Sequence, residues 1–96
     1  MRLCRVSYRF SKHKTISGLQ LHFNNGVDSP KFESKEVSKW GWQSAEIDPM
    51  DRVGKIDAYV CDDQGEISIK ALRFYDQAGV IMQVISMALK EDLGLR

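Results

Sequence analysis

The chain has 96 residues, of which 43% are hydrophobic and 28% charged, and its formal net charge is +1 at pH 7. This length predicts one domain with a modest core, and the composition is that of a globular chain rather than a disordered or collagen-like one. The near-neutral charge argues against nucleic acid as the partner, and no apolar run approaches the roughly 20 residues of a membrane span.

The compartment is inferred from the amino terminus and the cysteines. The amino terminus lacks the uninterrupted apolar core of a secretory signal. Cys4 and Cys61 permit at most one disulfide, and we expect both to be free thiols. These features favour a soluble, intracellular protein.

The first part of the chain predicts a β-hairpin. Apolar and polar residues alternate over residues 3–10 and again over residues 16–23. A polar turn, Lys12 to Thr15, separates the two runs.

A less regular segment follows the hairpin. Asn24 to Gly26 tolerate positive φ, and Pro30 prevents a regular ladder, so we expect a turn here. Residues 31–38 are interpreted as a short strand or a loop. A second short strand at residues 45–47 is expected to end in a turn at Asp48 and Pro49.

The second half repeats the hairpin. Strands are predicted over residues 53–60 and 67–74, with a turn from Asp62 to Glu66. Asp76 to Gly79 predict a turn, and the branched apolar residues over 80–85 that follow it predict a further strand. Ser86 to Gly94 is the only helix-like stretch, with Ser86 as N-cap and Gly94 as the stop.

An internal repeat connects the two halves. Ile16–Val27 and Ile69–Val80 match in pattern at a separation of 53 residues. We therefore predict a single all-β domain over residues 1–96, with repeat units at about 3–32 and 53–85. The arrangement expected is an antiparallel β-prism or a β-sandwich built from two repeated hairpin units, with a short C-terminal helix possible.

The phrase ISGLQLHFNNGVDSPKF, Ile16 to Phe32, resembles jacalin-like domains, and Ile56 to Val80 resembles the same unit with Ala71 at the place of Gly18. The resemblance implies a β-prism of three four-stranded sheets and a sugar-binding or protein-interaction role. Sugar-binding members carry a Gly-rich amino-terminal loop and a Gly-x-x-x-Asp loop, and this chain has neither.

A second resemblance concerns calcium. Asn24 to Ser29 is similar to the calcium-binding stretch of βγ-crystallins, although Asp28 stands where that family has a hydroxyl. Asp62, Asp63 and Glu66, with Asp48 and Asp51 nearby, are candidate oxygen ligands for Ca²⁺. A calcium-binding crystallin-like domain would use Asn24, Asp28, Asp62 and Asp63. The alternative interpretation is a solvated acidic turn, and no other cofactor is expected.

Aromatic and polar residues form the candidate contact set for a glycan or a protein. Trp40 and Trp42 flank Gly41, and at period two they would share one face of a strand. The candidate ligand-binding residues are Asn24, Asn25, Asp28, Trp40 and Trp42. The alternative interpretation places one tryptophan in the core.

No catalytic constellation is evident in the sequence. His13 and His22 fit no metal spacing and are expected at the surface, and no nucleophile elbow or phosphate loop is present. We therefore expect a non-catalytic interaction module, a protein-binding subunit of a larger assembly. The alternatives are a jacalin-like carbohydrate-binding module and a calcium-binding crystallin-like domain. The apolar excess near the carboxyl end assigns the interface to Val80, Ile81, Met82 and Val84.

Overall fold

The computed structural model describes residues 2–34, 40–63 and 65–87, and these contain strands and turns without a helix. The predicted all-β, antiparallel class is thus confirmed. The strands are β1 (Leu3–Phe10), β2 (Ile16–Phe23), β3 (Phe32–Glu33), β4 (Gln43–Glu46), β5 (Val53–Asp63), β6 (Glu66–Asp76) and β7 (Ile81–Ser86). The helix expected over residues 86–94 falls outside the described residues, except that Ser86 ends β7 and Met87 follows it.

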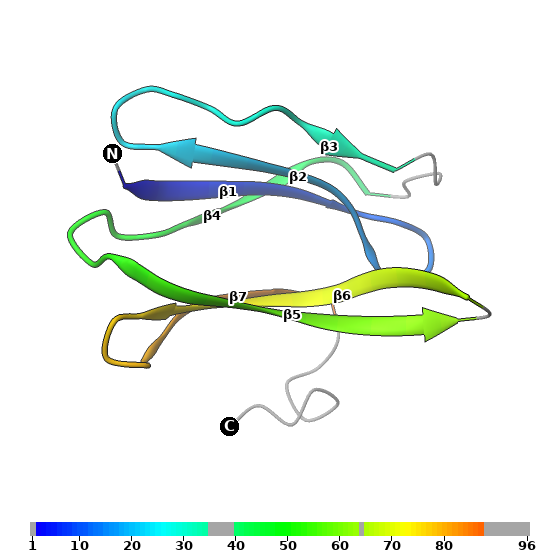
Figure 1. Ribbon diagram of the computed structural model, residues 1–96. Coiled ribbons are helices and arrows are strands. Elements are labelled where there is room, and N and C mark those ends of the chain that lie inside the picture. Colours follow the sequence, from blue (N-terminus) through cyan, green and yellow to red (C-terminus); the bar gives the residue numbers. More distant parts are fainter. Residues whose placement is uncertain (1, 35–39, 64, 88–96) are drawn as a thin grey trace.

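The strands form two antiparallel sheets, with the orders β3-β2-β1-β4 and β5-β6-β7. The sheets approach each other along β4 and β7, where the Gln83 side chain donates to the Glu46 carbonyl oxygen at 3.0 Å. They separate toward β3 and β5 (Figure 1). We call the β4/β7 margin the closed side and the β3/β5 margin the open side.

The core contains residues from both sheets, because one face of the longer strands is apolar. In β1, Val6 and Phe10 are buried, whereas Arg5 lies on the opposite face and is exposed. The buried hydrophobic cluster consists of Leu3, Val6, Phe10, Ile47, Leu72, Phe74 and Ile85. Three of these residues come from β6 and β7, so the core joins both halves of the chain.

The two halves use the same strand register. In the first half the pairs are Gly18–Glu33, Leu19–Phe32 and His22–Asp28. The corresponding pairs in the second half are Ala71–Ser86, Leu72–Ile85 and Tyr75–Ile81. Every residue of the second set lies 53 positions after its counterpart in the first. We call β1–β3 the first unit and β5–β7 the second unit.

The turn that follows β2 and the turn that follows β6 have the same hydrogen bonds. The amide of Phe23 donates to Val27 O at 2.9 Å, and the amide of Asp76 donates to Val80 O at 2.9 Å. Gly26 and Gly79 have φ values of 85° and 86°. Both predicted glycine turns are therefore confirmed, and both need the left-handed region that glycine adopts without strain.

The units differ in their third strands and in what lies beside their first strands. In the first unit, the segment that follows β2 pairs with β2 only near Asp28 and over Phe32–Glu33, and Pro30 between them has no amide hydrogen. In the second unit, β7 pairs with β6 along most of its six residues. In the first unit β4 pairs with the outer edge of β1. In the described part of the chain no strand pairs with the outer edge of β5. No helix of the described ranges is long and apolar enough to cross a membrane.

Candidate binding surfaces

An apolar surface lines the open side. Ile56, Ala58 and Val60 of β5 pair with Phe74, Leu72 and Ile69 of β6. Directly paired residues of an antiparallel ladder share one face of the sheet, so these β5 side chains point toward the other sheet. Ile56 is nevertheless 49% exposed and Val60 51%, because little of the opposite sheet lies over β5.

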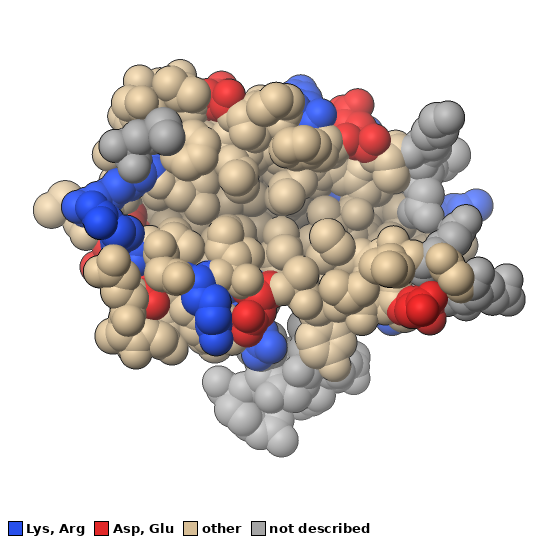
Figure 2. Space-filling model, in the orientation of Figure 1, with Lys and Arg blue, Asp and Glu red and all other residues tan. Residues whose placement is uncertain are grey.

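Phe32 completes the open side from the opposite sheet. It is 58% exposed, whereas its counterpart in the second unit, Ile85, is 1% exposed. Two hollows of about 350 and 440 Å³ lie along this margin. The first is lined by Arg2, Leu3, Leu21, Phe23, Arg52, Val53 and Ile56, and the second includes Ile16, Leu19, Phe32, Glu33, Ile69 and Leu72. Figure 2 shows a hollowed surface between the sheets that is mainly tan, with most of the acidic and basic side chains toward its margin.

The two tryptophans do not form the paired platform that their spacing predicts. Trp40 packs against the core. Trp42 lies on the outer face of the first sheet, where a Cβ on Gly18 would be 2.8 Å from its ring. The segment precedes β4 and is not part of a strand, so the period-two rule does not apply to it.

The ring of Trp42 already has several neighbours. The Arg9 guanidinium lies 5.6 Å and the Lys31 ammonium 5.1 Å from the ring centroid, which are cation–π distances. Arg9 also lies 3.9 Å from the Glu33 carboxylate. Together with the packing of its ring on Gly18, these contacts indicate that Trp42 connects β4 to β1 and to the segment beside β3.

His22 lies in a hydrogen-bonded array on this outer face. Its Nε2 is 2.7 Å from Ser7 Oγ, and its Nδ1 is 2.8 Å from Asp28 Oδ1. His22 is 8% exposed, so the expectation of a surface histidine is wrong. Asp28 covers the ring because the turn after β2 returns the chain to pair with His22. The six-residue spacing across an Asn-Asn-Gly turn is the sequence signal that could have indicated this contact.

Hydrogen bonds connect Ser7, His22 and Asp28 in the same serine–histidine–aspartate order as in the triad of serine hydrolases. Catalysis of acyl transfer also needs donors aimed at the developing oxyanion. Ser7 lies on a strand paired on both edges, by Gln20 of β2 and Ser44 of β4, so the surrounding backbone amides belong to the ladders. We therefore assign the array a structural role, joining β1, β2 and the following turn.

The remaining candidate ligand residues also stabilise this turn. Asn24 Oδ1 accepts from the Arg2 amide at 2.9 Å, and the Asn24 amide donates to Arg2 O at 2.8 Å. Asn25 Oδ1 accepts from the Val27 amide at 3.2 Å. One side-chain oxygen of each of Asn24, Asn25 and Asp28 is thus hydrogen-bonded within the fold.

The acidic residues considered for calcium lie at opposite ends of the molecule. The 11-residue strand β5 separates Asp51 from Asp62 by about 35 Å at the usual rise of a strand. Asn24 lies at the Asp51 end, since it bonds Arg2, whose guanidinium reaches Met50 O. Grouping Asn24 and Asp28 with Asp62 and Asp63, or Asp62 with Asp48 and Asp51, is therefore wrong. No three Asp, Glu, His or Cys side chains among the described residues form a metal-binding group, and the Asp63 side chain is outside them.

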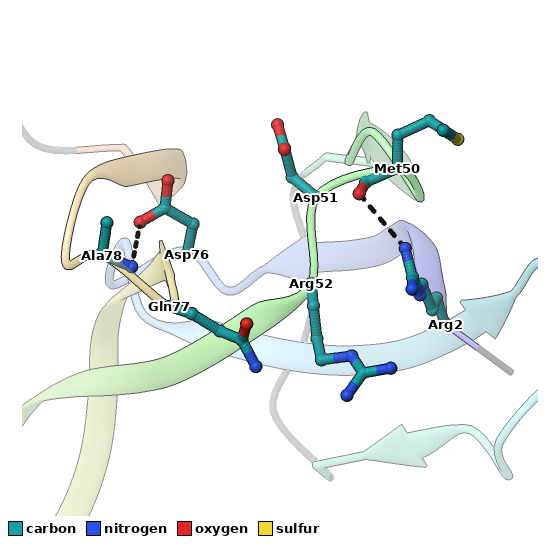
Figure 3. Close-up of a pocket in the computed structure, with 7 residues that line it drawn as sticks. All are labelled: Arg2, Met50, Asp51, Arg52, Asp76, Gln77 and Ala78. Atoms are coloured by element: carbon teal, nitrogen blue, oxygen red, sulfur yellow. Dashed lines mark hydrogen bonds between the residues drawn. The ribbon is translucent and has the colours of Figure 1, made fainter.

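A polar hollow of about 310 Å³ lies at the same end (Figure 3). It is lined by Arg2, Met50, Asp51, Arg52, Asp76, Gln77 and Ala78. Arg2 Nη1 donates to the carbonyl oxygens of Pro49 and Met50, each at 3.1 Å. Asp76 Oδ1 accepts from the Ala78 amide at 2.9 Å. These bonds hold the loops together, and the side chains of Asp51, Arg52 and Gln77 also line the hollow.

The expected interface residues do not form one surface. Val80 and Ile81 are exposed at the start of β7. Met82 instead packs against the core, and Val84 is half-buried. The larger set of exposed apolar side chains that share a face is found on the open side.

No protein-family model, curated protein or solved structure matches the chain. The functional proposal therefore depends on the geometry of these surfaces.

Proposed function

We propose that the domain is a non-catalytic protein-interaction module and that the open side is its contact surface. The observation that carries this proposal is the exposure of Ile56 and Val60, which point toward the other sheet yet remain about half exposed. We also propose that its two units form a β-sandwich, because β2 packs on β6 and the core is shared between the sheets.

The energetics favour a partner that supplies apolar side chains. Full burial of a valine or isoleucine side chain is worth about 1.5 to 3 kcal/mol, so each half-exposed residue retains about 1 kcal/mol for an interface. Contiguous exposed apolar surface marks protein-interaction sites in small domains. The mainly apolar lining of the open side suits a protein better than a sugar, which requires polar partners.

The location of this surface adds a second source of affinity. β5 is an edge strand, and an edge strand presents unpaired amide and carbonyl groups along one side. A partner strand can satisfy these groups while its side chains cover the apolar row. The free thiols of Cys4 and Cys61 agree with an intracellular setting for such an assembly.

The test is a pull-down from the native source with three forms of the chain. Ile56→Asp places a charge on the open side, and Val27→Asp is the matched control, because both native residues are 49% exposed and Val27 lies in the turn after β2. We expect the wild type and Val27→Asp to capture the same protein and Ile56→Asp to lose it. Equal capture by all three forms would contradict the proposed surface.

A further inference from the structure

The two units differ at one position in their sheets. In the first unit, β1 pairs with β2 on one edge and with β4 on the other. In the second unit, β5 pairs with β6, and its other edge carries no strand among the described residues. In the described ranges, no strand occupies beside β5 the position that β4 occupies beside β1; we call this the vacant position.

The registers define this vacancy residue by residue. Val6 pairs with Leu21, and Ile56 pairs with Phe74, the residue 53 positions after Leu21. On its other edge Val6 pairs with Ala45, and Val6 is 0% exposed. Ile56 has the same inward orientation but lacks the neighbour that corresponds to Ala45.

We infer that β5 of a second copy of this chain occupies the vacant position, so that two domains pair antiparallel through their β5 strands. The inference rests on the proposed function and identifies the partner. It joins the two three-stranded sheets into one continuous sheet and removes the exposed edge of each.

The sequence of β5 favours pairing with itself in one register. A two-fold axis perpendicular to the sheet keeps every side chain on its own face, so the axis passes between the two copies of one residue. With the axis at Ala58, Ile56 lies opposite Val60 of the second copy, and the two small Ala58 side chains meet. The inward row of both copies is then wholly apolar at its centre.

The same register also suits the outward face. Asp57 lies opposite Tyr59, and Lys55 lies opposite Cys61, so no like charges are paired. An axis at Asp57 would oppose two carboxylates. An axis at Tyr59 would place Ile56 opposite Asp62. The Ala58 register is therefore the favoured one of the three near the centre of β5.

The dimensions of β5 are adequate for such an interface. A stable interface removes about 800 Å² from each partner, about an eighth of the 6499 Å² surface of this chain. β5 has 11 residues and is among the longest strands of the fold. The half-exposed apolar side chains beside it add area to the strand pairing itself.

The first test is the mass of the full chain by light scattering over a range of concentrations. We expect a species of twice 11.0 kDa for the wild type and for Val27→Asp, and an 11.0 kDa species for Ile56→Asp, each with the same circular dichroism spectrum. A wild type that stays at 11.0 kDa up to the highest soluble concentration overturns the inference, as does an Ile56→Asp form that remains dimeric.

The second test is cross-linking, which remains informative if Ile56→Asp fails to fold. In a background of Cys4→Ala and Cys61→Ser, Ala58→Cys places one thiol at the axis, and Ala78→Cys places one on an exposed turn. Because paired β5 strands hold the two introduced thiols together at the axis, we expect the disulfide-linked dimer to form about tenfold faster for Ala58→Cys than for Ala78→Cys. Equal rates overturn the register.

These outcomes separate the inference from the function on which it rests. A monomeric wild type that still captures another protein, with capture lost in Ile56→Asp, overturns the self-pairing and retains the open side as an interaction surface. A dimer together with capture that Ile56→Asp does not affect retains the self-pairing and contradicts the open side as the surface for that other protein.

Discussion

Val6 and Ile56 occupy corresponding positions in the two units, and only Val6 is buried. Both lie on the inward face of the strand that begins the unit, opposite Leu21 and Phe74 respectively. The surroundings differ because β4 flanks β1 and the short β3 leaves much of β5 uncovered. The same strand position therefore serves the core in one unit and, in our proposal, a partner in the other.

This difference predicts unequal costs for shortening the two side chains. Val6→Ala leaves a cavity in the core and should lower the free energy of unfolding by about 2 kcal/mol. Ile56→Ala should cost less than about 1 kcal/mol at concentrations where the chain is monomeric, since half of the side chain is already in water. Urea denaturation of both variants measures the difference, and a greater cost at Ile56 would contradict this account of the open side.

Because Gly18 contacts the Trp42 ring, the stability cost of a substitution at Gly18 should depend on whether that ring is present. A Cβ at Gly18 would lie 2.8 Å from the Trp42 ring, so Gly18→Ala should cost about 1 to 2 kcal/mol while the ring is displaced. Gly41→Ala is the control, since nothing lies within 4 Å of its Cβ position. In a Trp42→Ala background, most of the cost at Gly18 should vanish. If Gly18→Ala costs as much in the Trp42→Ala background as in the wild type, the Trp42 ring is not the cause of that cost.

The equivalence of the two glycine turns predicts equal backbone costs. Gly26 and Gly79 share positive φ, and no atoms lie within 4 Å of the Cβ that a substitution would add. Each change to alanine should therefore cost about 1 kcal/mol through the backbone alone. Changes to asparagine should cost less, because asparagine tolerates the left-handed region. Thermal unfolding of the four variants tests this, and clearly unequal alanine costs would show that the turns are not equivalent.

Because His22 is hydrogen-bonded on both ring nitrogens, its substitution should lower stability more than is usual for a residue on an outer sheet face. His22→Leu leaves Ser7 and Asp28 without their ring partner and should cost about 1 to 3 kcal/mol. His13→Leu, in the exposed turn between β1 and β2, should change stability by less than about 0.5 kcal/mol. Chemical denaturation gives both values, and equal effects would remove the structural role assigned to the array.

Local sequence chemistry predicted most strands and turns well, but the turn expected over Asp62 to Glu66 is shorter, because β5 continues to Asp63 and β6 begins at Glu66. Alternation located both hairpins, glycine located the turns after β2 and β6, and Pro30 explained why the segment after the first turn pairs so little. These features depend on near neighbours in the chain. They are therefore accessible without knowledge of which strands meet.

The surfaces were harder to predict because they depend on which strand lies over which. Alternation shows that Ile56 and Val6 are both inward, but it does not show that one strand gains a neighbour and the other does not. Trp40 and Trp42 similarly separate because their segment lies before β4 and is not part of a strand. His22 seemed a surface residue because the return of Asp28 depends on the geometry of the intervening turn.

The most direct test of the central claim is amide hydrogen exchange along β5, measured at low and high concentrations of the full chain. Amides on an unpaired edge exchange readily, and pairing with a second strand protects them. We predict that protection of residues 56–60 rises with concentration, that β4 and β7 are unchanged, and that Ile56→Asp abolishes the rise. Exchange along β5 that is independent of concentration and equal in wild type and Ile56→Asp would contradict the claim.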